Sequence, residues 1–232
     1  MGSEMCIRDS ADTHLSFASN KPMDDFEGWL NYTDRLKENW NKIIDDKDYV
    51  VIAGDISWAM NFDELKADFD YINRLNGKKI ILKGNHDYWW NTMSKMNKFI
   101  EENNFNTISI LHNNAFDFDD FSVCGSRGWF FDSDEEQNEK VLNREVMRIK
   151  TSIESALNCE KIVFLHYPPV YENQCCEEIV NLLKEKGIKK CYYGHIHGVA
   201  AKYAFDDNYD GIDFKLISAD RLNFMPLLIK KF

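Results

Sequence analysis

Five short clusters of metal-binding residue types follow one another along the chain and use five of its six histidines. They combine imidazole, carboxylate and amide side chains, which suit borderline divalent ions such as Mn, Fe or Zn better than Ca or Mg. The clusters are Asp12-Thr13-His14, Gly54-Asp55, Gly84-Asn85-His86-Asp87, His166 and Gly194-His195-Ile196-His197. Single fragments of this kind are common, so the ordered set carries the signal. It indicates a centre for two divalent metal ions that acts on phosphoesters.

Four of the five clusters directly follow a short apolar run, so they occupy the same kind of position in the chain. These runs cover residues 49–53, 79–82, 161–165 and 188–193. Continuous apolar runs without polar alternation are typical of strands that are buried on both faces. Side chains at the ends of neighbouring strands meet at one edge of a sheet. We therefore expect the clusters to form one site.

The remaining segments alternate between helical and extended patterns. Helices are predicted within 26–44, from the capping pair Asn61 and Glu64 to Asn76-Gly77, over 92–102, from Ser133-x-x-Glu136 through Leu157, and over 177–186. Further strands are predicted over 107–111, 114–118, 121–125, 199–205, 211–218 and 226–229, with the first three antiparallel. Helices that flank two packed mixed sheets are the most economical architecture for this order.

The ordered motifs resemble those of the calcineurin-like metallophosphoesterase superfamily, from Asp12 to His197. The resemblance implies a four-layer α/β/β/α sandwich with a dinuclear metal centre. It further implies that Asp12, His14 and His197 bind one ion, that Asn85, His166 and His195 bind the other, and that Asp55 bridges them. Mn, Fe or Zn are the expected ions, with Ni as a further candidate.

Such a centre would lower the pKa of a water between the ions from about 15.7 towards about 7 and hold two phosphate oxygens. Asp12 and Asp55 would neutralise only half of the charge of two divalent ions, so the centre would attract a phosphate. Three unshared ligands and one shared ligand per ion leave room for water and substrate, unlike a closed structural site. We expect hydrolysis of a phosphomonoester or phosphodiester by metal-bound hydroxide.

Further roles follow from the resemblance and from the residues beside the motifs. His86 corresponds to the family's histidine that does not bind metal, which stabilises the transition state or protonates the leaving group, with Asp87 holding its tautomer. Arg127, Tyr88 and Tyr167 are the candidates for substrate binding by charge or stacking. His112 lies outside the pattern and is interpreted as a strand-end or surface histidine.

The residues around Asp55 and His86 also narrow the subfamily. The sequence Ile56-Ser57-Trp58 after the bridging aspartate is unlike protein Ser/Thr phosphatases and purple acid phosphatases, and the histidine at position 86 is unlike the lipid A pathway pyrophosphatases. What remains resembles the bacterial predicted phosphohydrolases of the superfamily.

The composition limits which partners and substrates are expected. The net charge of −11 argues against stable nucleic-acid binding and favours a phosphorylated small-molecule or nucleotide substrate. The cysteines lack a framework spacing, and no run of about 18 apolar residues could span a membrane, so a cytoplasmic protein is expected. The sequence leaves the oligomeric state open.

Residues 1–10 break the pattern, because Arg8 and Asp9 stand where a buried strand is expected before Asp12. We interpret 1–10 as a cloning or sequence-assembly artefact and 11–232 as a single metallophosphoesterase domain. Two alternatives to a small-molecule hydrolase stay open. One is a nuclease of the same superfamily, and the other is a non-catalytic protein-binding scaffold with this fold.

Overall fold

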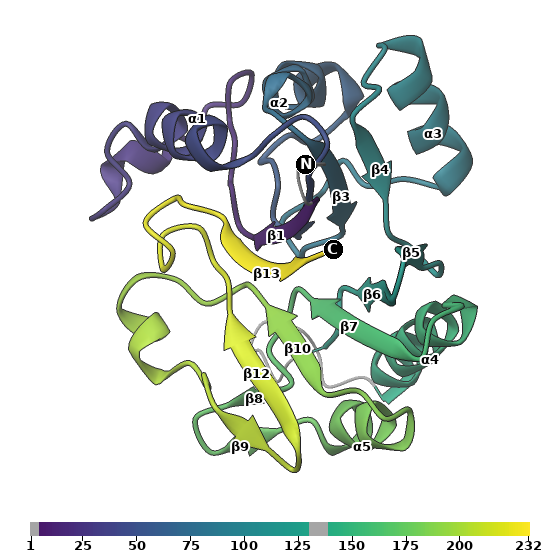
Figure 1. The fold of residues 1–232 in the computed structure, drawn as a ribbon. Coiled ribbons are helices and arrows are strands. Elements are labelled where there is room, and N and C mark those ends of the chain that lie inside the picture. The colour runs from purple at the N-terminus through teal and green to yellow at the C-terminus, as the bar shows by residue number, and fades with distance from the viewer. Residues whose placement is uncertain (1–4, 130–138) are drawn as a thin grey trace.

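The computed structural model describes residues 5–129 and 139–232, which build two mixed β-sheets packed against each other (Figure 1). The first sheet has the order β13-β1-β2-β3-β4, and the second has the order β11-β12-β10-β7-β6-β5. The first contains β1 (Cys6–Ser10), β2 (Tyr49–Ala53), β3 (Lys78–Leu82), β4 (Ile108–Ile110) and β13 (Leu227–Lys231). The second contains β5 (Phe116–Asp117), β6 (Phe121–Ser126), β7 (Glu160–Leu165), β10 (Lys190–Tyr193), β11 (Asn208–Tyr209) and β12 (Ile212–Leu216). β8 (Val170–Tyr171) and β9 (Gln174–Cys175) form a separate hairpin.

Three apolar clusters divide the molecule into four layers. One joins the first sheet to α1 (Tyr32–Ile43), α2 (Phe62–Arg74) and α3 (Met93–Glu102). Another joins the second sheet to α4 (Glu139–Ser155) and α5 (Glu177–Glu185) on the opposite side (Figure 1). The third lies between the sheets, where Ile7 and Val51 pack in one cluster with Val123 and Phe164. The predicted α/β/β/α sandwich is confirmed.

The inner strands of both sheets run parallel, which directs their carboxyl ends to the same edge. β1, β2, β3 and β4 are parallel neighbours in the first sheet, and β6, β7, β10 and β12 are parallel neighbours in the second. Among the described strands of these two sheets, only the outer pairs β1–β13, β5–β6 and β11–β12 are antiparallel. The expectation of three antiparallel strands over 107–125 is therefore wrong for β4, whose neighbour is β3.

The capping signal at the start of α2 is confirmed. The Asn61 side chain accepts a hydrogen bond from the Glu64 backbone N–H at 3.1 Å, and the Glu64 carboxylate accepts one from the Met60 N–H at 2.8 Å. The first bond satisfies a donor that the first helical turn leaves unpaired, and the second ties the residue before the N-cap to the helix. The predicted helix opening at Ser133 and Glu136 lies outside the described residues, and α4 is described from Glu139.

The segment 199–205 differs from its predicted strand. It forms η2, a 3-10 helix over Gly198–Tyr203. Another short 3-10 helix, η1, covers Met23–Asp25. Gly198 starts η2 with a φ of 53°, and its N–H donates to the Asp220 carboxylate at 2.8 Å. This bond holds the chain in a turn directly after His197, a tertiary contact that local alternation does not reveal.

Residues 6–10 occupy an inner position of the first sheet. β1 pairs in parallel with β2 and antiparallel with β13. Ile7 packs between the sheets, and Asp9 is fully buried with both carboxylate oxygens lacking a hydrogen-bond partner within the described residues. The strand expected before Asp12 is thus present, and its origin as an artefact stays a prediction. Within the described residues, no helix combines the length and the apolar character needed to cross a bilayer.

Candidate dinuclear metal centre

The five motifs meet at the carboxyl-terminal edge of both sheets. The loop after β1 carries Asp12 and His14 and hydrogen-bonds to the loop after β2, with Asp12 N donating to Gly54 O and His14 N to Asp55 O, both at 2.9 Å. The two sheets are joined at the same place, because His195 N, after β10, donates to the Asp12 carboxylate at 2.9–3.0 Å. Strand pairing therefore continues into the site and fixes the loops relative to one another.

The first group of side chains contains Asp12, His14 and His197, whose ligand atoms lie within 4.8 Å of one another. His14 Nε2 lies 3.2 Å from His197 Nε2, and His197 Nε2 lies 3.4 Å from Asp12 Oδ1. Asp12 and His14 are buried, while the His197 side chain keeps 26% of its surface exposed. Two imidazole nitrogens that face each other beside a carboxylate are suited to share one cation.

The second group contains Asp55, His166 and His195, also with ligand atoms within 4.8 Å. Asn85 joins it, because its Oδ1 lies 2.6 Å from His166 Nε2 and 3.0 Å from His195 Nδ1. His166 is fully buried, and its Nδ1 lies 3.1 Å from the carbonyl oxygen of Ala53. The backbone of β2 thus orients this imidazole and leaves Nε2 for a ligand role.

Asp55 lies between the two groups. Its Oδ2 is 3.8 Å from His14 Nε2, and its Oδ1 is 3.5 Å from His166 Nε2. The two oxygens of one carboxylate therefore face histidines of different groups. The mixture of imidazole, carboxylate and amide donors fits two borderline divalent ions at this place.

The electrostatics of the groups suit cations rather than protons. Burial lowers the pKa of His166 to about 3. Burial and the neighbouring imidazoles keep the pKa of His14 well below its usual value. Burial, together with the Asp87 and Asp12 carboxylates, raises the pKa of Asp55 well above its usual value. Neutral imidazoles are ready to bind a metal, and a cation would remove the unfavourable energy of the clustered carboxylates.

His197 behaves differently. Burial disfavours its charge, but the Asp12 and Asp220 carboxylates raise its pKa to about 10. Asp220 Oδ1 lies 3.1 Å from His197 Nδ1, and Asp220 Oδ2 accepts from the Gly198 N–H at 2.8 Å. Asp220 therefore fixes the orientation of this imidazole. The sequence analysis missed it, although its place just beyond the predicted strand 211–218 puts it at the same sheet edge.

Backbone strain is concentrated at the same residues. Asp12, His14, Asp55 and His195 have φ values of 57°, 43°, 49° and 72°. A left-handed conformation is unfavourable for residues other than glycine, by about 1–2 kcal/mol each. The surrounding pairing holds these residues in place, and strain of this kind is typical of functional sites.

Two glycines of the motifs allow the groups to approach each other. A Cβ on Gly84 would lie 2.1 Å from Asp55 Oδ1, and a Cβ on Gly194 would lie 2.5 Å from Asp12 Oδ2. Any side chain at either position would displace a carboxylate of the site. This explains why glycine precedes Asn85 and His195 in the sequence.

His86 borders the site but belongs to neither group. Its N–H donates to Asp55 Oδ1 at 2.8 Å, its ring lies 4.5 Å from the Trp58 ring, and its Nδ1 lies 3.2 Å from the Tyr88 hydroxyl. Trp58 also stacks on His14 at 4.8 Å. The tryptophan therefore holds two imidazoles of the site beside each other.

Asp87 is held by backbone donors from two neighbouring loops. Its described hydrogen bonds go to the backbone, where its carboxylate accepts from Ile56 N at 2.8 Å, Ser57 N at 3.3 Å and Gly84 N at 2.7 Å. Burial raises its pKa to about 6, although these N–H donors lower it. Asp87 thus links the loops after β2 and β3, and its role in holding the His86 tautomer stays a prediction.

The three candidate substrate-binding residues have different surroundings. Tyr88 is half exposed, whereas Tyr167 is buried, with its ring 4.5 Å from that of His195. Arg127 lies over the Tyr167 ring at 5.6 Å and 4.0 Å from Glu145. Tyr167 therefore packs against a candidate metal ligand, and substrate binding by Arg127, Tyr88 and Tyr167 stays a prediction.

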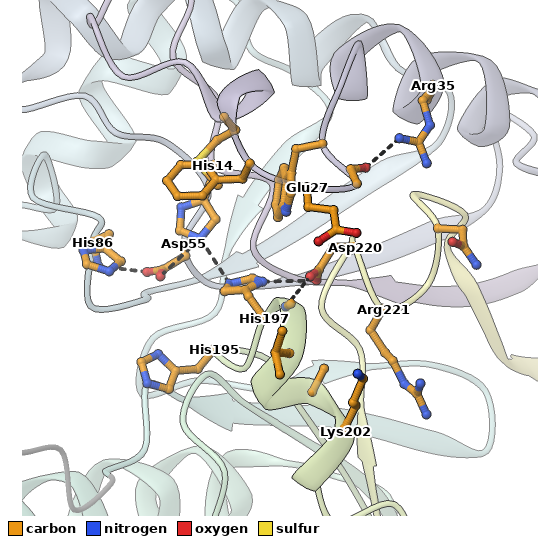
Figure 2. A pocket seen from close by; sticks show the side chains of 18 of the residues that line it. His14, Glu27, Arg35, Asp55, His86, His195, His197, Lys202, Asp220 and Arg221 are labelled. Carbon is orange, nitrogen blue, oxygen red and sulfur yellow. Dashed lines mark hydrogen bonds and ion pairs between the residues drawn. The ribbon is translucent and has the colours of Figure 1, made fainter.

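A cavity of about 940 Å³ opens beside the two groups (Figure 2). His14, Asp55, His86, His195 and His197 contribute to its wall. Trp58, which flanks the Asp55 motif, also lines it. Its other lining residues include five that sequence reasoning did not identify as site residues, namely Phe26, Trp29, Lys202, Asp220 and Arg221. His112 lies outside this wall, with its ring 6.1 Å from that of Trp90.

Comparison with known proteins agrees with the family that the sequence motifs resemble. The family model of the calcineurin-like phosphoesterases matches residues 10–199. An uncharacterized protein, MJ1445, from Methanocaldococcus jannaschii is 34% identical over 82 residues, which are 33% of this chain and 44% of that protein. The chain thus spans less than half the length of this curated relative.

Solved structures show the same fold at low identity. Phosphopantetheinyl hydrolase from Mycobacterium tuberculosis superimposes with a TM-score of 0.58 and 13% identity, covering 99% of this chain and 97% of that one. A protein of unknown function, AQ665, from Aquifex aeolicus gives a TM-score of 0.50 and 15% identity, covering 97% and 95%.

Proposed function

Because this chain belongs to the calcineurin-like phosphoesterase family, we propose that it hydrolyses a phosphomonoester or phosphodiester of a small or nucleotide-like compound with two divalent metal ions. Asp12, His14 and His197 would hold one ion. Asn85, His166 and His195 would hold the other, and Asp55 would bridge them. Mn, Fe or Zn are the proposed ions, because they accept mixed nitrogen and oxygen ligands.

The position of Asp55 is the observation that supports this proposal most directly. Its Oδ2 faces His14 and its Oδ1 faces His166, so one carboxylate can serve both groups. A structural metal site needs no shared ligand and usually closes its shell with protein side chains. Here a cavity adjoins both groups, which leaves access for a phosphoester.

The ions, when bound, would supply an activated water and hold two oxygens of the phosphate. Hydrolysis forms a bond from water oxygen to phosphorus and breaks the bond from phosphorus to the leaving oxygen. His86 would give a proton to that oxygen from Nε2, since its Nδ1 lies beside the Tyr88 hydroxyl. Trp58, stacked on His14 and close to His86, would keep the two rings in position.

The direct test measures hydrolysis of p-nitrophenyl phosphate and bis-p-nitrophenyl phosphate after chelation and separate reloading with Mn, Fe, Zn or Ni. Activity that is lost on chelation and restored by one or more ions supports the proposal. A metal-loaded protein that is inactive on a broad panel of phosphoesters would favour the scaffold instead. Salt-sensitive cleavage of single-stranded DNA would favour a nuclease.

His86→Ala tests the proton donor separately from metal binding. General acids contribute about 10²–10⁴-fold, and poor leaving groups need the proton most. The variant is expected to retain its metal content and to lose activity on alkyl phosphates, with a smaller loss on p-nitrophenyl phosphate. Equal losses on both substrates, measured as kcat/KM, would contradict the acid role.

A further inference from the structure

The cavity is larger than one phosphoryl group requires. Its volume of about 940 Å³ is near the upper end of the range, about 300–1,000 Å³, in which proteins enclose ligands of drug size. The metal-binding groups form only part of its wall, which continues over Phe26, Val199, Lys202 and Arg221. The part of the substrate that is not hydrolysed would therefore contact this remaining wall, whose side chains indicate what that part of the substrate is.

Two cations of this wall are tied to the metal-binding groups through the backbone. Lys202 lies on η2, which begins directly after His197. Arg221 follows Asp220, whose carboxylate contacts His197 Nδ1 at 3.1 Å and Gly198 N at 2.8 Å. In the view of Figure 2, Lys202 and Arg221 lie at one end of the cavity and His86 at the other. One aspartate thus positions both a candidate metal ligand and the segments that carry the cations.

The charge of these cations is only weakly compensated. Within the described residues, no carboxylate forms an ion pair with Lys202. Arg221 lies 3.6 Å from Asp206 Oδ2 with half of its side chain exposed. Asp206 meanwhile accepts a hydrogen bond from Leu216 N at 2.6 Å. Two cations in one cavity of a chain with a net charge of −11 indicate a local preference for anions.

The remaining charges of the cavity leave this preference in place. Arg35 adds a third cation, which donates to the Gly28 carbonyl oxygen at 2.7 Å and lies over the Phe224 ring at 4.7 Å. Glu27 opposes it as an exposed carboxylate on the same wall. Asp220 is engaged with His197 and Gly198, so it does not neutralise Arg221. The cations outnumber the carboxylates that remain available.

From this arrangement we infer that Lys202 and Arg221 form an anion subsite for a second phosphoryl group, so that the substrate carries two phosphates. The inference rests on the proposed function, which places the first phosphate at the metal ions. Lysine and arginine are the side chains that bind phosphate most effectively, by charge and by charge-assisted hydrogen bonds. Phe26 and Val199 are exposed on the same wall and suit an apolar or flat spacer between the phosphates.

The test compares adenosine 3′,5′-bisphosphate with adenosine 5′-monophosphate and adenosine 3′-monophosphate on the metal-loaded protein. We measure kcat/KM by phosphate release and the dissociation constants by calorimetry. The bisphosphate should be preferred at least about tenfold, the scale of one hydrogen bond to a charged group. In Lys202→Ala/Arg221→Ala the preference should fall to nearly one, and Lys202→Glu should lower it further than Lys202→Ala.

A matched control removes an exposed cation elsewhere. Lys98, on α3, lies 3.6 Å from Glu102 and outside the cavity wall, so Lys98→Ala should keep the preference for the bisphosphate. Both substituted cations are at the surface, so folding can be verified by the melting temperature. Increasing salt should reduce the preference, because these charges are open to solvent.

The outcomes separate this inference from the proposed function. If wild type and the double variant handle bisphosphate and monophosphates with the same kcat/KM, the subsite is wrong while the phosphoesterase stands. If the loaded protein hydrolyses no phosphoester, the proposed function is wrong, and the dissociation constants decide the subsite alone. A bisphosphate that binds no tighter than the monophosphates overturns it in either case.

Discussion

β1 and β2 are neighbouring parallel strands, yet their sequences have opposite character. β2 is apolar, and four of its five residues are fully buried. β1 contains Arg8 and Asp9, and the Cα partner of Asp9 in β2 is Val51. The side chains of Asp9 and Val51 are both completely buried. The same backbone register thus holds a favourable side chain in one strand and an unfavourable one in the other.

The loops that follow the two strands carry the two sides of the metal centre. The loop after β1 provides Asp12 and His14, and the loop after β2 provides Asp55. Their backbones bond to each other through Asp12 N and His14 N. The comparison therefore indicates that β2 is stabilised by its own burial, whereas β1 and its loop are held by their neighbours. Four predictions test this difference.

The largest expected effect on activity comes from substituting Asp55, the carboxylate between both groups, compared with substituting Asp12, which belongs to one group. Asp55→Ala removes the ligand between both groups, so kcat/KM should fall by more than about 10³-fold, with weaker binding of both ions. Asp12→Ala removes a ligand from one group and should leave one ion per chain. Metal content by elemental analysis, with activity on p-nitrophenyl phosphate, measures both.

The apo proteins provide the control for this pair. Because burial raises the pKa of Asp55, removal of its carboxylate should not destabilise the metal-free fold. Thermal unfolding after chelation checks this. Full retention of two ions in Asp55→Ala would contradict the bridging role.

The second prediction exchanges the character of the strands. Val51→Asp places an unpaired carboxyl at a fully buried position of β2, opposite Asp9. An uncompensated buried charge destabilises by about 3–5 kcal/mol. Urea unfolding at neutral pH should show this loss. Val51→Thr, which keeps the shape without a charge, is the control and should lose much less.

Third, the two groups differ in what orients their imidazoles. In the first group, the Asp220 side chain orients His197. In the second group, the backbone carbonyl of Ala53 in β2 orients His166. Only the first support can be removed by substitution. Asp220→Asn should lower the affinity for the ion that His197 helps to bind by about 10–100-fold, the usual effect of removing a hydrogen-bond partner of a metal ligand. The affinity for the other ion should not change.

Competitive metal titration with a chromophoric chelator resolves the two affinities. Asp213→Asn, on β12 close in sequence and exposed, serves as the control. An equal loss at both ions would show that Asp220 supports the fold in general rather than one imidazole.

The sequence predicted the sandwich and the meeting of the motifs because both depend on short-range signals. Apolar runs identify strands, and polar residues at their ends must converge wherever the strands are parallel. Asp220, Lys202 and Arg221 escaped prediction because their roles depend on how distant segments pack beside His197. The contacts of Asp87 with the backbone and of Tyr167 with His195 escaped prediction for the same reason, since a motif does not state which neighbours a side chain faces.

The fourth prediction concerns Asp9 and has the smallest effect. Burial raises the pKa of its carboxyl well above the usual 3.8, although Lys215 lowers it. The folded state therefore keeps a proton that the unfolded state has already lost above pH 3.8. Asp9 consequently lowers the free energy of unfolding as pH rises from 3.8 through the folded pKa.

Asp9→Val should stabilise the protein by about 1–3 kcal/mol at neutral pH, since it replaces unpaired buried oxygens with methyl groups. The gain should be small near pH 4 and grow by at most about 1.36 kcal/mol per pH unit until it levels off above the folded pKa. Urea unfolding of both proteins between pH 4 and pH 8 measures it. A constant gain across this range would mean that Asp9 stays ionised in the fold, with Lys215 as its effective partner. A loss of stability would mean that β1 requires this carboxyl, and that the contrast with β2 does not extend to their side chains.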